Sequence, residues 1–100
     1  MTLSNDDKKR LRGIGHRLGP VVTIAAKGLS APVLAELERA LNDHELIKIR
    51  LALPTRAERT GAITEICRQC GAELVQVIGH TALLLRGSNR PNPRLSRLPR

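Results

Sequence analysis

Residues 46–53 read LIKIRLAL, and the spacing of their side chains decides the fold. Upstream of this stretch apolar residues recur at helical intervals, whereas from residue 47 to residue 53 every second residue is apolar. Lys48 and Arg50 occupy positions between them. An alternation of this kind is typical of a strand with one face in the core and the other in solvent. We therefore predict a strand with one buried and one basic face.

Three elements are predicted before this strand. A helix over about residues 5–17 begins at the N-cap Ser4 and carries apolar residues at helical spacing. A short buried strand follows at about residues 21–25. Ser30 then caps a second helix, which has a single apolar stripe.

Three more elements are predicted after it. Thr55 and Glu58 form a capping box for a third helix, which we expect to run to about Cys70. Two strand-like runs then flank Gly79-His80, a pair suited to a two-residue type II′ turn. The predicted order is α-β-α-β-α-β-β. Two β-α-β crossovers and a closing hairpin predict an α/β fold of two layers with a four-stranded mixed sheet.

The C-terminal segment, residues 87–100, reads GSNRPNPRLSRLPR. It contains three prolines, four arginines and no acid. A segment of this composition cannot build a core of its own. We therefore predict a globular domain over residues 1–86 and a flexible basic tail over residues 87–100.

The chain is strongly basic and contains no aromatic residue. Seventeen Lys and Arg against nine Asp and Glu give a net charge of +8 over 100 residues, which indicates a polyanionic partner. Without Phe, Tyr or Trp, the modules that stack bases on aromatic rings are disfavoured. A nucleic acid would be contacted mainly through its phosphates, its sugars and its shape.

Neither a signal peptide nor a membrane-spanning segment is expected. The first ten residues are polar, and no stretch approaches the roughly 20 apolar residues that a spanning helix needs. The two cysteines lie too close together to join distant segments, so an oxidising compartment is not implied. We expect a cytoplasmic protein without a membrane partner.

The segment CRQC, from Cys67 to Cys70, is the motif most open to a redox or metal interpretation. It falls at the end of a predicted helix, where the helix dipole does not lower a thiol pKa, and no second ligand pair with zinc spacing follows. Packing in the core is the favoured interpretation, with a redox or metal site as the alternative. In the absence of a nucleophile motif we expect no catalysis, no cofactor and no small-molecule substrate.

The segment IAAKGLS (24–30) joins the first predicted strand to the second predicted helix. A lysine cation, a flexible glycine and the free N–H groups of a helix N-terminus suit a phosphate. An ordinary turn with a solvated lysine is the alternative. The predicted RNA-binding residues are those of the loop and the flanking cations: Ala25, Ala26, Lys27 and Gly28 with Arg12, Arg17, Lys48 and Arg50.

Two stretches carry a resemblance to a known family. They are residues 11–51, which include HELIKIR (44–50), and residues 70–87, which include QVIGHT (76–81). Together they resemble the CRM domain, named for chloroplast RNA splicing and ribosome maturation, and above all its stand-alone bacterial YhbY-type form. The similarity extends over about residues 3–87.

This resemblance implies a fold similar to the C-terminal domain of translation initiation factor three, and RNA binding without chemistry. The family loop between the first strand and the second helix reads G-x-x-G, and Ala25 replaces its first glycine here. The resemblance also implies a ribosome-assembly factor that binds ribosomal RNA in precursors of the large subunit. A protein–protein adaptor with a basic surface is the alternative function.

Overall fold

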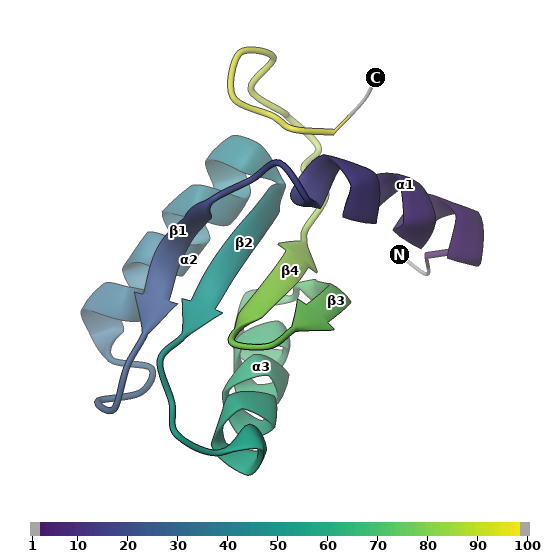
Figure 1. Ribbon diagram of the computed structural model, residues 1–100. Helices are drawn as coiled ribbons and strands as arrows, with labels where there is room; N and C mark the ends of the chain where they lie inside the picture. The colour runs from purple at the N-terminus through teal and green to yellow at the C-terminus, as the bar shows by residue number, and fades with distance from the viewer. Residues whose placement is uncertain (1–2, 99–100) are drawn as a thin grey trace.

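The helices and strands follow one another in the predicted order. The computed structural model describes residues 3–98. The elements in Figure 1 are α1 (Asn5–Gly15), β1 (Pro20–Ile24), α2 (Ala31–His44), β2 (Leu46–Leu51), α3 (Arg56–Cys70), β3 (Glu73–Ile78) and β4 (Thr81–Leu85). The first helix ends at Gly15 rather than near residue 17, and β2 ends at Leu51 rather than at residue 53.

The strands form one mixed sheet in the order β1-β2-β4-β3. β1 is parallel to β2, with Thr23 opposite Arg50, and β4 is antiparallel to both β2 and β3. The chain therefore crosses over through α2 from β1 to β2 and through α3 from β2 to β3. The β3–β4 hairpin then returns β4 to the centre of the sheet. The α/β class, the mixed sheet and both predicted crossovers are confirmed.

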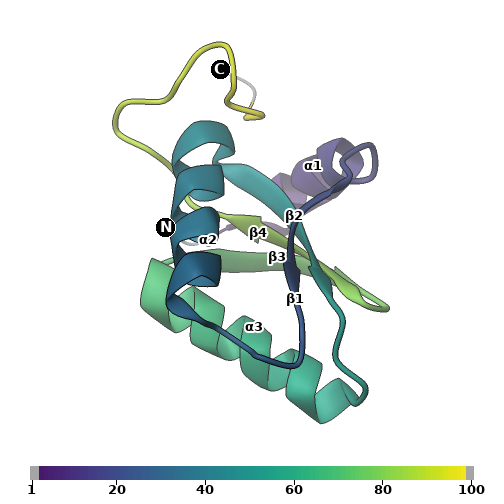
Figure 2. The ribbon, with the colours of Figure 1, turned by 90° about the vertical axis from the view of Figure 1, so that its left-hand side faces the viewer.

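Helices cover both faces of the sheet, which differs from the two layers expected from the sequence. α2 and α3 lie on one face over the larger buried cluster, and α1 crosses the other face (Figures 1 and 2). Leu11 of α1 is buried there against side chains from three strands: Leu46, Val75, Leu83 and Leu85. Because these strands have apolar side chains on both faces, the second face also needs a cover.

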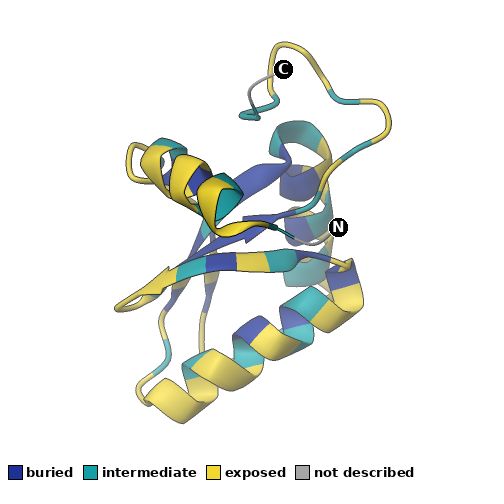
Figure 3. Ribbon diagram, turned by 90° about the vertical axis from the view of Figure 1, so that its right-hand side faces the viewer, coloured by how far each residue is buried: buried dark blue, intermediate teal, exposed yellow. Residues whose placement is uncertain are grey.

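α1 covers only part of that second face. Leu46, at the start of β2, is fully buried beneath it, whereas Val21, Thr23 and Arg50 remain exposed. The outer side of α1 is itself largely exposed (Figure 3). A surface that includes α1 and the open ends of β1 and β2 therefore faces solvent.

The ends of the helices and the hairpin follow the local signals in the sequence. Ser4 caps α1 and Thr55 caps α3, each in a capping box with a carboxylate three residues further on. In the hairpin, Gly79 has a φ of 56°, whereas His80 has no positive φ. This combination fits the expected type II′ turn.

The segment after β4 folds back onto the domain, in contrast to the flexible tail expected from its composition. The backbone N–H of Arg97 donates to the carbonyl of His44 (3.0 Å), and the Arg97 guanidinium donates to the carbonyl of Leu46 (3.1 Å). Leu98 packs against the cluster beneath α1. The segment has no acid of its own, and it uses acceptors from the α2–β2 junction instead. A domain boundary after residue 86 stays a prediction.

Candidate nucleic-acid interface

The loop between β1 and α2 is a tight turn that ends at Gly28. The Gly28 N–H donates to the carbonyl of Ala25 (2.8 Å), and Gly28 has a φ of 69°. No atom lies within 4 Å of the position that a Cβ on Gly28 would take, so backbone conformation rather than space selects glycine there. Neither Ala25 nor Ala26 has a positive φ, which explains why alanine is tolerated at position 25.

Lys27 is exposed beside the N-terminus of α2. Ser30 caps this helix and accepts a hydrogen bond from the N–H of Val33 (3.4 Å). The first turn of α2 has no acidic residue, whereas α1 and α3 both begin with carboxylates. The positive end of the α2 dipole therefore lacks a local carboxylate, which favours an anion there. Binding by this loop stays a prediction.

Lys48 and Arg50 lie on the sheet face opposite α2 and α3. Their neighbours Ile47 and Ile49 are fully buried beneath those helices, so strand alternation places the two cations on the side of α1. Arg50 is exposed and Lys48 is half-buried. β2 thus has the expected buried face and a basic opposite face, except where Leu46 lies beneath α1.

α1 and the turn that follows it lie at the other end of β1 from the β1–α2 loop (Figure 1). Arg12 is in the last turn of α1, Arg17 precedes β1, and both are exposed. The five residues of β1 separate this turn from the Lys27 loop by roughly 17 Å. Lys48 and Arg50 lie between these ends on the neighbouring strand. The predicted residues therefore form a stripe along the sheet rather than one cluster.

The balance of charge differs between the two sides of the molecule, although α2 and α3 also carry four arginines. Residues 8–35 contain six Lys or Arg and no Asp or Glu. Five of the nine acids lie on the two helices of the opposite layer: Glu36, Glu38, Asp43, Glu58 and Glu65. We refer to the surface formed by α1, the β1–α2 loop and the open part of β1 and β2 as the basic face.

Arg59 and His80 lie at the same end of the sheet as the β1–α2 loop, although sequence reasoning did not select them. Nη1 of Arg59 donates to the carbonyl of Leu53 (2.9 Å) and lies 3.3 Å from Nε2 of His80. The pairing of Arg50 with Thr81 brings the hairpin beside the end of β2. Only this register places Arg59 and His80 near the loop. Because no local sequence pattern encodes the register, the two residues could not be identified from the sequence.

Arg86, directly after β4, is not part of the basic face. Its guanidinium donates to the carboxylate of Glu38 (2.8 and 2.9 Å), to the carbonyl of Cys70 (2.9 Å) and to the side chain of Asn42 (2.9 Å). These partners belong to α2 and to the end of α3. Arg86 is therefore a cation that joins two helices.

Cys67 and Cys70 are free thiols that pack with the larger core cluster. Burial raises the pKa of both thiols, and the negative charges of Glu73 near Cys67 and Glu38 near Cys70 raise it further. A raised thiol pKa disfavours the thiolate that redox and metal chemistry require. Within residues 3–98, no group of three or more His, Cys, Asp or Glu is placed to hold a metal ion.

Alkylation should distinguish the packing interpretation from a redox site. We expect iodoacetamide at pH 7.5 to modify both cysteines of the folded protein more slowly than a free thiol, and at an ordinary rate after unfolding. Since the thiols ionise more readily in the unfolded chain, the free energy of unfolding should fall as the pH rises above about 8.5. Rapid modification of either folded cysteine would instead support a reactive pair.

Together the fold and the site define a small α/β domain with one basic face that lacks aromatic side chains. None of the helices in the described part of the chain has the length and apolar character needed to cross a lipid bilayer. The chain belongs to the CRS1/YhbY (CRM) domain family, whose family model matches residues 3–86.

Two bacterial relatives are similar over nearly their whole length. A protein of Pseudomonas aeruginosa named a probable RNA-binding protein is 50% identical over 100 residues, which cover 100% of this chain and 96% of the relative. An RNA-binding protein of Haemophilus influenzae is 44% identical over 96 residues, covering 96% and 97% of the two chains. The solution structure of a hypothetical protein from Staphylococcus aureus matches the fold with a TM-score of 0.78 at 24% identity, covering 94% and 97%.

Proposed function

We propose that this chain is an RNA-binding protein without enzymatic activity, and that its target is ribosomal RNA in precursors of the large ribosomal subunit. The observation that carries the proposal is the uneven balance of charge, with an acid-free run of cations over residues 8–35 and five of the nine acids on α2 and α3. Such a surface attracts a polyanion. The names of relatives at 50% and 44% identity support RNA as that polyanion.

The RNA would be held by its backbone. With no aromatic side chain for stacking, the available contacts are cations and backbone N–H groups, which bind phosphates and sugars. The β1–α2 loop combines both kinds of group, through Lys27 and the uncompensated N-terminus of α2. Four further cations extend this contact along the basic face: Arg12, Arg17, Lys48 and Arg50. Contacts of this kind select a folded RNA by its shape.

The proposed role is that of a stoichiometric binder in the cytoplasm, which holds an RNA conformation until later proteins arrive. It is supported by membership of a family named in part for ribosome maturation. A single domain with a stripe of cations can shield one backbone segment without a catalytic centre.

Binding across a salt series tests the proposal at Lys27. We expect the protein to bind a structured fragment of large-subunit ribosomal RNA more tightly than an unrelated structured RNA of equal length. Lys27→Ala should weaken binding and flatten the slope of log K against log salt by about 0.7–0.9, because one phosphate contact is lost. Both quantities can be measured by fluorescence anisotropy with labelled RNA.

Arg68→Ala is the matched control. Arg68 is an exposed cation on α3, on the opposite layer, and it pairs with Glu65. Its removal should leave the slope unchanged. Equal slopes for wild type and Lys27→Ala would show that the loop is only a turn. If the wild type bound no RNA, the adaptor function would take precedence.

A further inference from the structure

Glu45 is a buried carboxylate in an unfavourable position. It follows α2 as its C-cap, its side chain is fully buried, and it alone among the non-glycine residues of 3–98 has a positive φ (63°). The C-terminal end of a helix carries partial negative charge, so a carboxylate buried there is destabilising unless donors surround it. Its surroundings must therefore hold both its backbone and its side chain.

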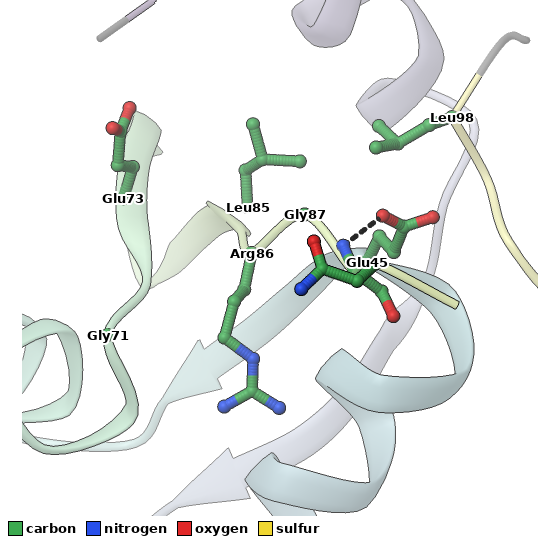
Figure 4. Close-up of a pocket in the computed structure, with 9 residues that line it drawn as sticks. Glu45, Gly71, Glu73, Leu85, Arg86, Gly87 and Leu98 are labelled. Atoms are coloured by element: carbon green, nitrogen blue, oxygen red, sulfur yellow. Dashed lines mark hydrogen bonds between the residues drawn. The ribbon is translucent and has the colours of Figure 1, made fainter. Parts of the chain in front are cut away.

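One C-terminal segment supplies donors at both of its ends. The backbone N–H of Ser88 donates to Oε2 of Glu45, and the hydroxyl of Ser96 donates to Oε1, each at 2.6 Å. The first of these hydrogen bonds is the dashed line in Figure 4. A single carboxylate thus closes the chain between these two serines into a loop. We refer to residues 88–98 as the arm.

Further contacts fix the returning part of the arm. Nδ1 of His44 donates to the carbonyl of Leu95 (2.9 Å), and Arg97 donates to the carbonyls of His44 and Leu46. Leu98 packs against the cluster beneath α1. Ser88 and Leu98, at the two ends of the arm, both line a cavity of about 440 Å³ (Figure 4).

The outer part of the arm is a compact turn around Asn92. The Asn92 side chain accepts a hydrogen bond from the N–H of Arg94 (3.0 Å), and its carbonyl accepts from Leu95 (3.1 Å) and Ser96 (2.8 Å). A proline on each side of Asn92 restricts the backbone further. The turn is therefore ordered in advance, which lowers the entropy cost of binding a partner.

The side chains of Arg90 and Arg94 take no part in the hydrogen bonds that hold the arm. Both are exposed, and neither side chain makes an ion pair or hydrogen bond with another residue of the described range. Arg97, in contrast, is bound to the domain through its guanidinium. Two neighbouring cations in an arm without acids repel each other, which is destabilising unless a polyanion binds.

We propose that the arm, closed on Glu45, is a second RNA-contacting element that presents Arg90 and Arg94 to phosphates. Figures 1 and 2 both place it at the end of the molecule opposite the β1–α2 loop, and Figure 2 shows its outer turn on the α2 side. The inference rests on the proposed RNA binding and deepens it, because the RNA backbone is then contacted at both ends of the molecule.

The arginines can be tested without disturbing the fold, since both are exposed. In the salt series, the double variant Arg90→Ala/Arg94→Ala should bind RNA more weakly, with a slope flatter by about 1.4–1.8 for two lost phosphate contacts. The matched control, Arg39→Ala/Arg68→Ala, removes the same charge from exposed positions on α2 and α3 and should leave the slope unchanged. Equal slopes for wild type and Arg90→Ala/Arg94→Ala would overturn the inference.

Opening the arm tests the role of Glu45. Glu45→Gly removes the carboxylate at a backbone conformation that glycine adopts easily. Trypsin should then cleave faster after Arg94 and Arg97, which limited proteolysis measures. RNA binding should weaken although the net charge rises by one. If about a tenth of the molecules keep the arm closed, the apparent dissociation constant should rise about tenfold.

The possible outcomes separate the two proposals. Weaker RNA binding by Glu45→Gly, despite its additional positive charge, would support a closed arm that contacts RNA. Unchanged proteolysis of Glu45→Gly, or faster proteolysis with RNA binding as tight as in the wild type, would overturn the inference. A wild-type protein that binds no RNA would instead overturn the proposed function itself.

Discussion

Gly15→Val should lower the free energy of unfolding by about 2–3 kcal/mol, at the upper end of what overpacking costs. Gly15 is buried where the end of α1 meets the sheet, and a Cβ on it would lie 2.8 Å from Cδ1 of Leu83 and closer still to Cδ2. Leu83, a residue of β4, is itself buried in the cluster beneath α1 and has little room to move. Urea unfolding followed by circular dichroism measures the loss.

Gly13→Val on the same helix is the control. No atom lies within 4 Å of a Cβ at Gly13, and valine has a higher helix propensity than glycine. The control variant should be as stable as the wild type or slightly more stable. If the two variants were equally stable, α1 would not be seated on Leu83, and its place on the second face of the sheet would be wrong.

The seating of α1 also matters for the proposed function. Arg12 projects from this helix and Arg17 from the turn that follows it. Their position relative to β2 is fixed only while Leu11 remains buried against the sheet. Gly15→Val should therefore weaken RNA binding as well, whereas Gly13→Val should not.

Local features of this fold could be predicted from the sequence because each has a local cause. Side-chain caps at Ser4 and Thr55 begin two helices, and Gly79 supplies the positive φ of the hairpin. The change of period at Ile47 identifies a strand because the side-chain repeat of a strand is 2. The order of the elements then limits the connections to right-handed crossovers.

The two-layer expectation missed the place of α1 for a physical reason. Alternation in β2 indicates one apolar face, but β4 after Thr81 is a continuous apolar run with no polar side. A central strand that is apolar on both faces needs cover on both. Leu46 points to the same conclusion. Alternation along β2 places this apolar residue on the face of Lys48, and in the structure it is fully buried there.

The contacts of the arm could not be predicted from the sequence, because their main acceptor is a residue far away along the chain. Composition indicates that residues 87–98 have no core of their own. It gives no sign that Ser88 and Ser96 both reach the carboxylate of Glu45. The candidate site shows the same limit, because the separation of Arg17 from Lys27 follows from the course of β1 and not from any motif.

Replacing Arg86 should lower stability without changing how RNA binding depends on salt. We expect Arg86→Met to lower the free energy of unfolding by about 2–3 kcal/mol, because it leaves the Glu38 carboxylate and the Cys70 carbonyl without the guanidinium they bind. For a domain of this size the midpoint of thermal unfolding should fall by roughly 10–20 °C. Calorimetry measures the shift, and the salt series below the transition measures binding.

Arg68→Met is the control for this variant, since its exposed ion pair with Glu65 should contribute little to stability. Near-equal unfolding temperatures for the two variants would contradict the structural role of Arg86. A flatter salt slope for Arg86→Met with stability intact would move Arg86 to the RNA contact surface. If Arg86→Met kept the salt slope of the wild type but was less stable, Arg86 would have a structural role only. Exposure of the side chain would then be the feature that distinguishes the proposed RNA-binding arginines, Arg90 and Arg94, from this structural one.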